Sequence, residues 1–216
     1  DPDGGIWVGT YGGKLAYMTF ADNGVDYFKA TPGGLNHPIV SCFEEDSEGN
    51  LWIGTEGGGI NRWDRRDGRF VYYTQESRCG LTSNMIKKLW HDGNDRLLVS
   101  AFNGGMRVFD ERQGRFSDLH MNHPASGQPL SVYDFAKEGD RGIWLTDPDA
   151  ELMYKDASTG RVETVRLTDA QGNAVRIHIE TLFHDERGNL WLVGHDGAYV
   201  VDPATRRILK RHYIAE

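Results

Sequence analysis

The chain has 216 residues, of which 38% are hydrophobic and 27 are glycine, and its formal net charge is −8. Its 24 Lys and Arg against 32 Asp and Glu argue against nucleic acid as a partner, because binding to phosphate backbones depends on clustered positive charge. No apolar run is long enough to span a bilayer, so we expect a soluble chain that makes no membrane contact itself. It opens with Asp rather than Met and shows no signal peptide, which predicts an excised or processed piece.

One sequence pattern returns five times. An acidic turn leads into an apolar anchor residue, a Gly-rich turn follows, and residues 50–64 show the pattern most clearly. The pattern recurs every 45 to 47 residues, and so regular a period indicates a repeat architecture. It excludes a cofactor loop at 50–64, because one ligand does not need five similar loops. We therefore predict no cofactor. The anchors are Trp7, Trp52, Leu98, Trp144 and Trp191, at steps of 45, 46, 46 and 47 residues.

Each repeat carries four short strand signals separated by turns whose glycines can adopt positive φ. No segment has the sustained 3.6-residue apolar spacing of a helix. Four antiparallel strands at this period match a β-propeller blade, so the predicted fold class is all-β, a β-propeller of four-stranded antiparallel blades. The strands predicted in the second copy are 38–46, 50–55, 59–64 and 69–75, and those in the third are 83–90, 96–101, 105–110 and 115–120.

The ends of the repeat array predict an incomplete arc of about five blades within a single partial propeller. The first copy begins at its turn and second strand, and the fifth stops just after its fourth strand. Natural proteins usually cover bare sheet faces and edges, so we expect pairing with another copy or with other blades of the parent protein. The predicted blades are 1–34, 35–80, 81–127, 128–175 and 176–216.

The four recurrent Trp residues are predicted to pack between neighbouring blades rather than to bind a ligand. A blade is covered on both faces, and an indole offers a large flat surface for that contact. The Gly or Ser two residues later is expected to leave room for the indole. We predict the same packing role for Met18, Trp63 and Phe109, which share a position in the third strand.

Cysteine and histidine spacing predicts neither a disulfide nor a metal site. Cys42 and Cys79 are expected to be free thiols, with Cys42 in the core; a bridge would instead indicate an oxidising compartment. The nearest His pair, His120 and His123, lies in a variable connection without the ligand spacing of a metal site. The DPDGG and DPDAE segments lack the full spacing of a calcium loop, so turn formation is the better interpretation. DSEGN and DERGN resemble aspartate boxes, which are themselves structural.

Ligand contacts in a propeller come from the turns between second and third strands and from the blade connections, because loops on a rigid scaffold carry function. The residues at these positions mix carboxylates, amides, imidazoles and two aromatic rings, a mixture suited to a sugar. The alternative for each residue is a solvated turn without a ligand. The candidate residues are Tyr11, Glu56, Phe102, Asn103, Asp149, Glu151, His195 and Asp196 in turns, and Asn36, His37, Asn84, Arg176 and His178 in connections.

The second copy, with its lead-in GGLNHPIVSCF, resembles the two-component regulator propeller repeat. The third copy repeats the lead-in as CGLTSNM and the fifth repeats the turn and strand as FHDERGNLWLVG, whereas the fourth is degenerate. The resemblance implies the periplasmic sensor region of a hybrid two-component system histidine kinase of the Bacteroidetes type, which detects oligosaccharides released from glycans and closes with seven blades. The kinase, membrane span and DNA-binding regulator that the resemblance implies are not in this sequence, so we expect this chain itself neither to phosphorylate nor to bind DNA.

Three functions remain open. The leading one is ligand sensing, without catalytic residues in this chain. The second is a propeller enzyme, a lyase or a glycosidase, since streptogramin-lyase-like propellers are similar in repeat style. Against it, the sequence shows no nucleophile motif and no spacing that would support a pair of catalytic acids. The third is a protein-interaction scaffold that binds no small ligand.

Overall fold

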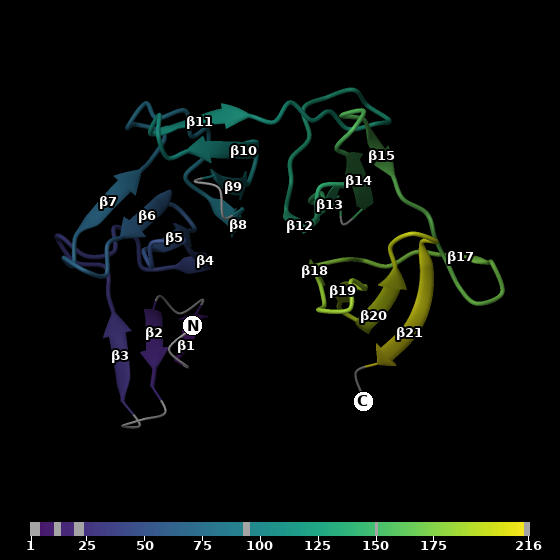
Figure 1. Cartoon of the computed structure of the whole chain (residues 1–216), viewed down its shortest axis with the longest axis horizontal. Coiled ribbons are helices and arrows are strands. Elements are labelled where there is room, and N and C mark those ends of the chain that lie inside the picture. The colour runs from purple at the N-terminus through teal and green to yellow at the C-terminus, as the bar shows by residue number, and fades with distance from the viewer. Residues whose placement is uncertain (1–4, 11–13, 20–23, 93–95, 150, 214–216) are drawn as a thin grey trace. The chain divides into compact units, whose positions relative to one another are not determined.

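The computed structural model describes residues 5–10, 14–19, 24–92, 96–149 and 151–213. The chain divides into two compact units, Asp1–Leu119 and His120–Glu216. Within these described ranges the regular secondary structure consists of β-strands without helices, which confirms the all-β prediction (Figure 1). No helix capable of crossing a membrane occurs among them.

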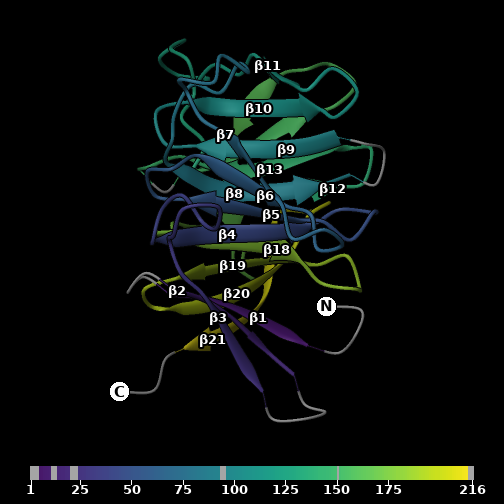
Figure 2. The same cartoon turned by 90° about the vertical axis from the view of Figure 1, so that its left-hand side faces the viewer.

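The described part of the first unit holds three antiparallel sheets, each with its strands in sequence order. The second and third sheets match the predicted strands one by one, and Figure 2 shows β11, β10, β9 and β8 side by side in that order. The first sheet is β1 (Ile6–Thr10), β2 (Lys14–Met18) and β3 (Val25–Phe28). The second is β4 (Val40–Glu45), β5 (Leu51–Thr55), β6 (Ile60–Trp63) and β7 (Phe70–Tyr73). The third is β8 (Ile86–His91), β9 (Arg96–Ala101), β10 (Gly105–Asp110) and β11 (Arg115–Asp118).

The described second unit holds a four-stranded and a six-stranded sheet. The four-stranded sheet is β12 (Asp134–Glu138), β13 (Gly142–Thr146), β14 (Leu152–Asp156) and β15 (Val162–Thr164). The six-stranded sheet contains β18 (Thr181–His184), β19 (Leu190–Gly194), β20 (Gly197–Asp202) and β21 (Arg207–Tyr213), extended by β16 (Leu167–Thr168) and β17 (Ala174–Val175).

The β16–β17 hairpin covers the outer edge of the last sheet. Repeat spacing assigns these residues to the fourth copy, yet β16 runs parallel to β21, with Thr168 opposite Arg207. The N–H of Thr168 donates to the carbonyl of Arg206 at 3.2 Å. Covering an outer strand in this way satisfies an exposed ladder of backbone groups, which is how natural proteins protect sheet edges.

A carboxylate six residues before the anchor ties each acidic turn to the indole that follows it. Each described pair has the same geometry, since the carboxylate accepts from the indole Nε1–H. The side chain thus fixes the indole ring and the preceding turn together, which confirms that the aspartate-box-like segments are structural. The pairs are Asp46 with Trp52, Glu138 with Trp144 and Asp185 with Trp191, each 2.9 Å between the carboxylate oxygen and Nε1.

Asp46 shows how these turns are held. Its Oδ1 accepts the N–H of Glu48 at 3.0 Å and of Asn50 at 2.8 Å, and the amide of Asn50 also donates to it. Burial alone would raise the pKa of Asp46, but the hydrogen bonds from Asn50 and Trp52 hold it below its usual value. The ionised carboxylate is therefore the form that organises the turn.

In the first unit the aromatic anchors pack between neighbouring sheets, as predicted. Trp52 is fully buried, and its ring centroid lies 5.2 Å from that of Phe109 in the third sheet. Trp7 is half-buried and meets Trp63 of the second sheet edge to face at 6.1 Å. Edge-to-face contacts of this kind add to the free energy of burying the rings.

Trp144 follows that pattern, whereas Trp191 and Met18 depart from it. Trp144 is buried in a core shared with β18 to β21. Trp191 is half-buried and stacks on Phe183 and His212 of its own sheet. Met18 occupies the predicted third-strand position but is 39% exposed, so its packing prediction is wrong for the described structure. In the described first unit no sheet lies against its face.

The glycine two residues after Trp52 has a different role from the one expected. A Cβ on Gly54 would lie 2.5 Å from Sγ of Cys42 and 2.7 Å from Cγ2 of Ile86. The missing side chain therefore leaves room for the inner strand of the next sheet, not for the indole. Ser100 and Thr146 occupy this position in later sheets, where their buried hydroxyls find no hydrogen-bond partner in the described part of the chain.

Both cysteines are free thiols, as predicted. Cys79 lies inside the core around Trp52, and Cys42 is half-buried against the same core. They act as small apolar residues there, which is the usual role of a free cysteine in an interior.

Candidate functional site

Two predicted residues of the first unit come together around a lysine. Glu56 follows β5 and Phe102 follows β9, while Lys87 lies on β8. Lys87 Nζ is 2.9 Å from Oε1 of Glu56 and 5.7 Å from the ring centroid of Phe102. The backbone of Met85 joins both turns, because it bridges to Glu56 and accepts the N–H of Phe102 at 2.9 Å. Sequence reasoning missed Lys87, since nothing in a strand pattern shows which turn it reaches. We call these three side chains the Glu56–Lys87–Phe102 group.

Predicted amides in the blade connections hold neighbouring turns. Asn36 donates through Nδ2 to the carbonyl of Gly58 at 2.7 Å and accepts from the amide of Asn61 at 2.9 Å. Asn84 accepts the N–H of Gln75 at 2.8 Å. The local structure thus occupies part of the hydrogen-bonding capacity that was predicted to face a ligand.

Two further candidates of the first unit, His37 and Asn103, are placed differently. His37 accepts the N–H of Ile39 through Nδ1 at 3.3 Å, so one ring nitrogen serves the local turn. Asn103 has a φ of 52°, a left-handed conformation that Asn tolerates better than most residues. Tyr11 lies outside the described residues.

In the second unit the structure brings Asp149, Glu151, Arg176 and His178 to one groove of about 330 Å³. All four were predicted as site residues from separate turns and connections. The rest of the groove is mainly aliphatic and belongs to the start of β14, the end of β15 and the chain from β16 to β18. Its remaining lining residues are Leu152, Thr164, Val165, Leu167, Val175, Ile177 and Ile179. We call this the second-unit groove.

A network that the sequence analysis did not foresee lies beside the groove. Oδ1 of Asp147 accepts the N–H of Asp149 at 3.1 Å and of Glu151 at 3.0 Å, which shapes the DPDAE turn. His123 Nε2 lies 3.9 Å from Oδ2 of Asp147 and 3.6 Å from Oε2 of Glu151. Nη2 of Arg176 lies 3.5 Å from Oε1, the other carboxylate oxygen of Glu151. Burial raises the pKa of Asp147, and the charges of Asp149 and Glu151 raise it further.

His123, Asp147 and Glu151 are close enough to share a metal ion, with potential ligand atoms within 4.8 Å of one another. The histidine, however, is oriented as a hydrogen-bond donor. Its Nδ1 accepts the N–H of Ala125 at 3.2 Å and of Ser126 at 3.3 Å, so the neutral ring carries its proton on Nε2, which faces the carboxylates. A metal ligand must be unprotonated at the coordinating nitrogen. The observed geometry therefore fits a polar network in which the Nε2–H of His123 points toward the two carboxylates, rather than a metal centre.

The two remaining candidates lie in the turn after β19. The rings of His195 and His178 stack with centroids 5.5 Å apart, and His195 Nε2 is 3.1 Å from Oε1 of Glu180. The hydroxyl of Tyr199 donates to Asp196. Burial, followed by this carboxylate, raises the pKa of Tyr199 to about 12. His195 thus extends the polar rim of the groove through His178, whereas Asp196 pairs locally.

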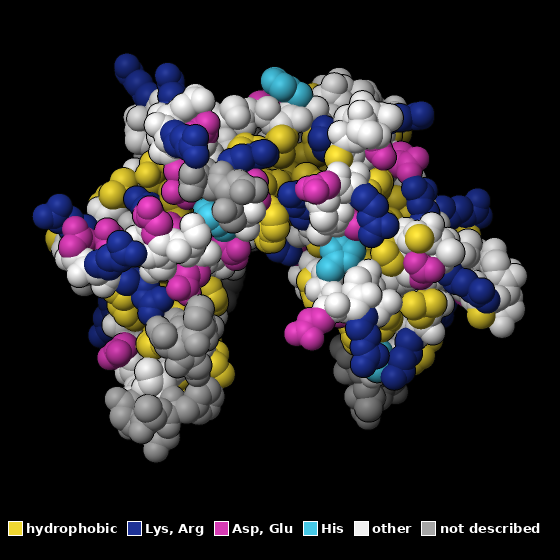
Figure 3. Space-filling view, in the orientation of Figure 1, with side chains coloured by type: hydrophobic (Ala, Val, Ile, Leu, Met, Phe, Trp, Pro, Cys, Tyr) yellow, Lys and Arg dark blue, Asp and Glu magenta, His cyan; other side chains and the backbone are white. Residues whose placement is uncertain are grey.

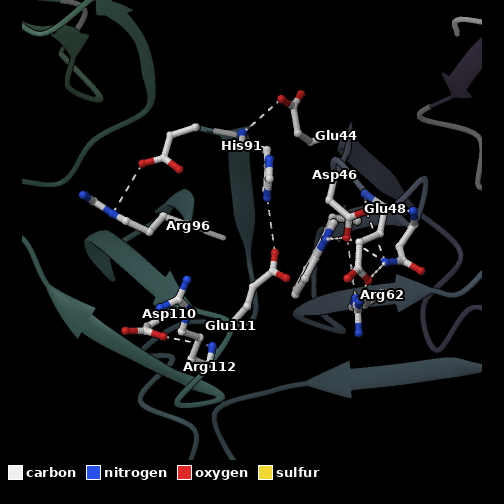
Figure 4. Close-up of polar contacts among 12 residues, drawn as sticks. Glu44, Asp46, Glu48, Arg62, His91, Arg96, Asp110, Glu111 and Arg112 are labelled. Carbon is white, nitrogen blue, oxygen red and sulfur yellow. Dashed lines mark hydrogen bonds and ion pairs between the residues drawn. The ribbon is translucent and has the colours of Figure 1, made fainter. Parts of the chain in front are cut away.

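A separate polar cluster joins the second and third sheets of the first unit (Figure 4). Glu44 accepts the backbone N–H of His91 at 3.0 Å, and His91 Nε2 lies 3.3 Å from Oε1 of Glu111. Burial raises the pKa of both carboxyl groups. Because Glu44 reaches the backbone of the neighbouring sheet, we assign this cluster to the scaffold.

Charge of both signs lies close together on the face of each unit seen in Figure 3, consistent with the paired groups above. None of the polar groups described above is a basic patch of the kind that binds phosphate backbones. The class that the fold and these sites define is a β-propeller protein with loop-borne polar groups.

The comparisons with known proteins agree with this class. The model of the two-component regulator propeller matches residues 34–57, the stretch on which the resemblance was based. The match confirms, for residues 34–57, the predicted resemblance to the two-component regulator propeller repeat. No curated protein matches the sequence.

Solved structures extend the likeness to the whole chain. The extracellular domain of a protein described as a hybrid two-component system from B. thetaiotaomicron is similar with a TM-score of 0.73 and 22% identity, over 100% of this chain and 30% of that chain. A second such domain from B. thetaiotaomicron has a TM-score of 0.72 and 16% identity, over 99% of this chain and 27% of that one. A catalytically inactive variant of virginiamycin B lyase from Staphylococcus aureus has a TM-score of 0.69 and 12% identity, over 100% of this chain and 68% of that chain. At these identities the likeness establishes the propeller fold. The chain spans less than a third of the length of the two extracellular domains.

Proposed function

We propose that this chain is a ligand-sensing propeller segment of the extracytoplasmic, periplasmic part of a hybrid two-component sensor, and that it passes its signal to a kinase outside this chain. One observation carries the proposal: a two-component regulator repeat within a chain whose full length resembles extracellular domains of such systems. A rigid stack of sheets suits this role because it presents loops from several repeats to one ligand.

The ligand class we propose is an oligosaccharide derived from glycans. The Glu56–Lys87–Phe102 group supports it, since a half-buried aromatic ring lies beside a paired carboxylate and ammonium. Sugars present C–H surfaces to aromatic faces and hydroxyls to charged or amide groups. Asn84 and Asn103 flank the same turns and offer further polar atoms.

Calorimetry of the 216-residue chain with a panel of glycan oligosaccharides tests this proposal. We expect saturable heat for at least one member, and Phe102→Ala should weaken binding about tenfold by removing the ring face. Tyr27→Ala is the matched control, because Tyr27 is an aromatic residue on β3 that is 60% exposed. An absence of heat across the panel would leave the interaction scaffold as the better function.

An enzyme is the second candidate, favoured by the similarity to a lyase and by the His123–Asp147–Glu151 network. Carboxylates beside an imidazole are groups that general acid–base catalysis uses, and Glu151 is the one of them that lines the groove. Chromatography of the same incubations distinguishes the candidates: a sensor leaves the oligosaccharide intact, whereas an enzyme consumes it and loses that activity in Glu151→Gln.

We also propose that the outer face of the first sheet is covered by another blade, from a second copy or from the rest of the parent protein. Ile6, Met18 and Val25 face each other in register across β1, β2 and β3, and are 46%, 39% and 40% exposed. In the second sheet the equivalent positions of β5 and β6 are Leu51 and Trp63, which pack against the first sheet. The same face is thus apolar in both sheets but lacks a cover in the described first sheet.

A further inference from the structure

The floor of the second-unit groove is aliphatic. Leu152, Val165, Leu167 and Ile177 are at least nine-tenths buried and belong to the core of the unit, and half-buried Val175 packs against that core. None of the residues that line it in the described structure is Phe, Tyr or Trp, the side chains that offer a large ring face to a sugar. Its volume of about 330 Å³ falls at the small end of small-molecule sites. The groove therefore suits an aliphatic group of a few carbons.

The rim of the groove carries an excess of negative charge on one turn. Asp147, Asp149 and Glu151 lie within five consecutive residues, and they face the neutral imidazole of His123 and the guanidinium of Arg176. The Arg176 side chain is 93% exposed, so its ion pair with Glu151 contributes little and can open easily. The carboxylate of Asp149 has no ion pair or side-chain hydrogen bond within the described second unit, and it is exposed at the groove. The raised pKa of Asp147, caused by burial and then by these neighbouring charges, is consistent with an uncompensated negative potential.

We propose that the second-unit groove binds a small primary alkylammonium ion, with its chain on the aliphatic floor and its ammonium group between Asp149 and Glu151. An ammonium has three donors and no acceptor, which matches two carboxylates at one end of an apolar groove. It replaces Arg176 as the partner of Glu151. The ligand class differs from the oligosaccharide proposed above, so the two sites succeed or fail independently.

A nuclear magnetic resonance titration of the full chain at pH 7 tests the inference with three probes of equal length: n-hexylamine, n-hexanol and hexanoate. We expect saturable shifts with hexylamine for backbone amides around Glu151, Val175 and Ile177. Hexanol should bind more weakly than hexylamine by a factor of about ten at least, because it lacks the positive charge. Hexanoate should not bind, and n-butylamine should bind more weakly than hexylamine because it buries fewer methylene groups.

Variants then identify which residues of the groove rim bind the ammonium group. Asp149→Asn should weaken hexylamine binding about tenfold, whereas Asp140→Asn, an equal change of charge at an exposed turn of the same unit, should leave it unchanged. Arg176→Gln should leave binding equal or tighter, because it removes the competing cation. Val175→Trp should block the groove, and a thermal melt shows whether that variant is folded.

Three outcomes would overturn the inference. Hexanoate binding that is lost in Arg176→Gln would make the site an anion site. Saturation of the same amides by Mg²⁺, Ca²⁺ or Zn²⁺, with no dependence on amine chain length, would make it a cation site formed by His123, Asp147 and Glu151. A lack of saturable shifts with any amine would show that the groove is only a packing defect.

Discussion

Gly54 illustrates how a single position decides the spacing between sheets. The residue two after the anchor is Gly9, Gly54, Ser100, Thr146 and Val193 in the five copies. At Gly54 an added methyl group would collide with Cys42 and with Ile86 of the next sheet, while at Gly9 the nearest atom, in Val40, is 3.5 Å away, an ordinary contact. The same small residue is thus required in one sheet and tolerant of replacement in another.

The Gly54→Ala substitution should therefore destabilise the chain by ~1–3 kcal/mol, as overpacking of a close-packed interior does. Gly9→Ala is the matched control, with the same chemical change at the equivalent strand position, and we expect less than about 1 kcal/mol from it. Urea denaturation followed by Trp fluorescence measures both. Equal losses in the two variants would contradict the assignment of Gly54 to inter-sheet contact.

At the scale of elements, the acidic turn works as a unit with the strand that follows it. Asp185 accepts hydrogen bonds from the backbone of Arg187 and Asn189, from the amide of Asn189 and from the indole of Trp191. The Asn189 amide and the Trp191 indole lower the pKa of Asp185 to about 2, from an ordinary value of 3.8. The turn is therefore stabilised by the ionised carboxylate.

This turn should make folding stability depend on pH in the acid range. A carboxyl group with a lowered folded pKa contributes stability that is fully present above pH 3.8 and is lost as the pH falls toward 2. The difference in free energy of unfolding between the natural chain and Asp185→Asn should therefore shrink from pH 5 to pH 2. Denaturation series at fixed pH values check this, with Asp140→Asn as a control for the change of charge. A constant difference for Asp185→Asn would show that the carboxylate is not the stabilising form.

Hairpins and edges also differ in how far they can be predicted. The strands of the second and third sheets follow from local pattern, because alternation and glycine turns act within a few residues. The β16–β17 hairpin does not, since its parallel pairing with β21 joins Thr168 to Arg207, far along the chain. Repeat spacing assigns the hairpin to the fourth copy, whereas in the structure it pairs with the last sheet and protects its edge.

For the whole molecule, the apolar outer face of the first sheet leads to a prediction about association. If a second copy of this chain covers Ile6, Met18 and Val25, sedimentation velocity should show concentration-dependent self-association. Met18→Lys should reduce it, because a charge would be buried in the contact. Met85→Lys is the control, since Met85 is 38% exposed in a connection rather than on this face. A clean monomer at high concentration would mean that a second copy is not the cover.

The candidate site was partly predictable at this scale. The propeller rule that turns and connections gather on one face selected Asp149, Glu151, Arg176 and His178, and the structure places these four residues around one groove. It did not select Lys87, which lies on a strand, nor His123, although His123 lies in a connection. His123 was set aside for lacking ligand spacing along the chain, yet it reaches a carboxylate 28 residues later.

The sequence by itself determined the period, the four-stranded unit and the turns, because the strand and turn patterns arise from interactions between residues a few positions apart and recur along the chain. Only the tertiary structure decided which side chains meet across sheets: Lys87 with Glu56, His123 with Glu151, and Gly54 with Ile86. These contacts depend on how one sheet stacks on the next and on how connections fold back. Stacking is set by side-chain volume over a whole face, which no local pattern encodes.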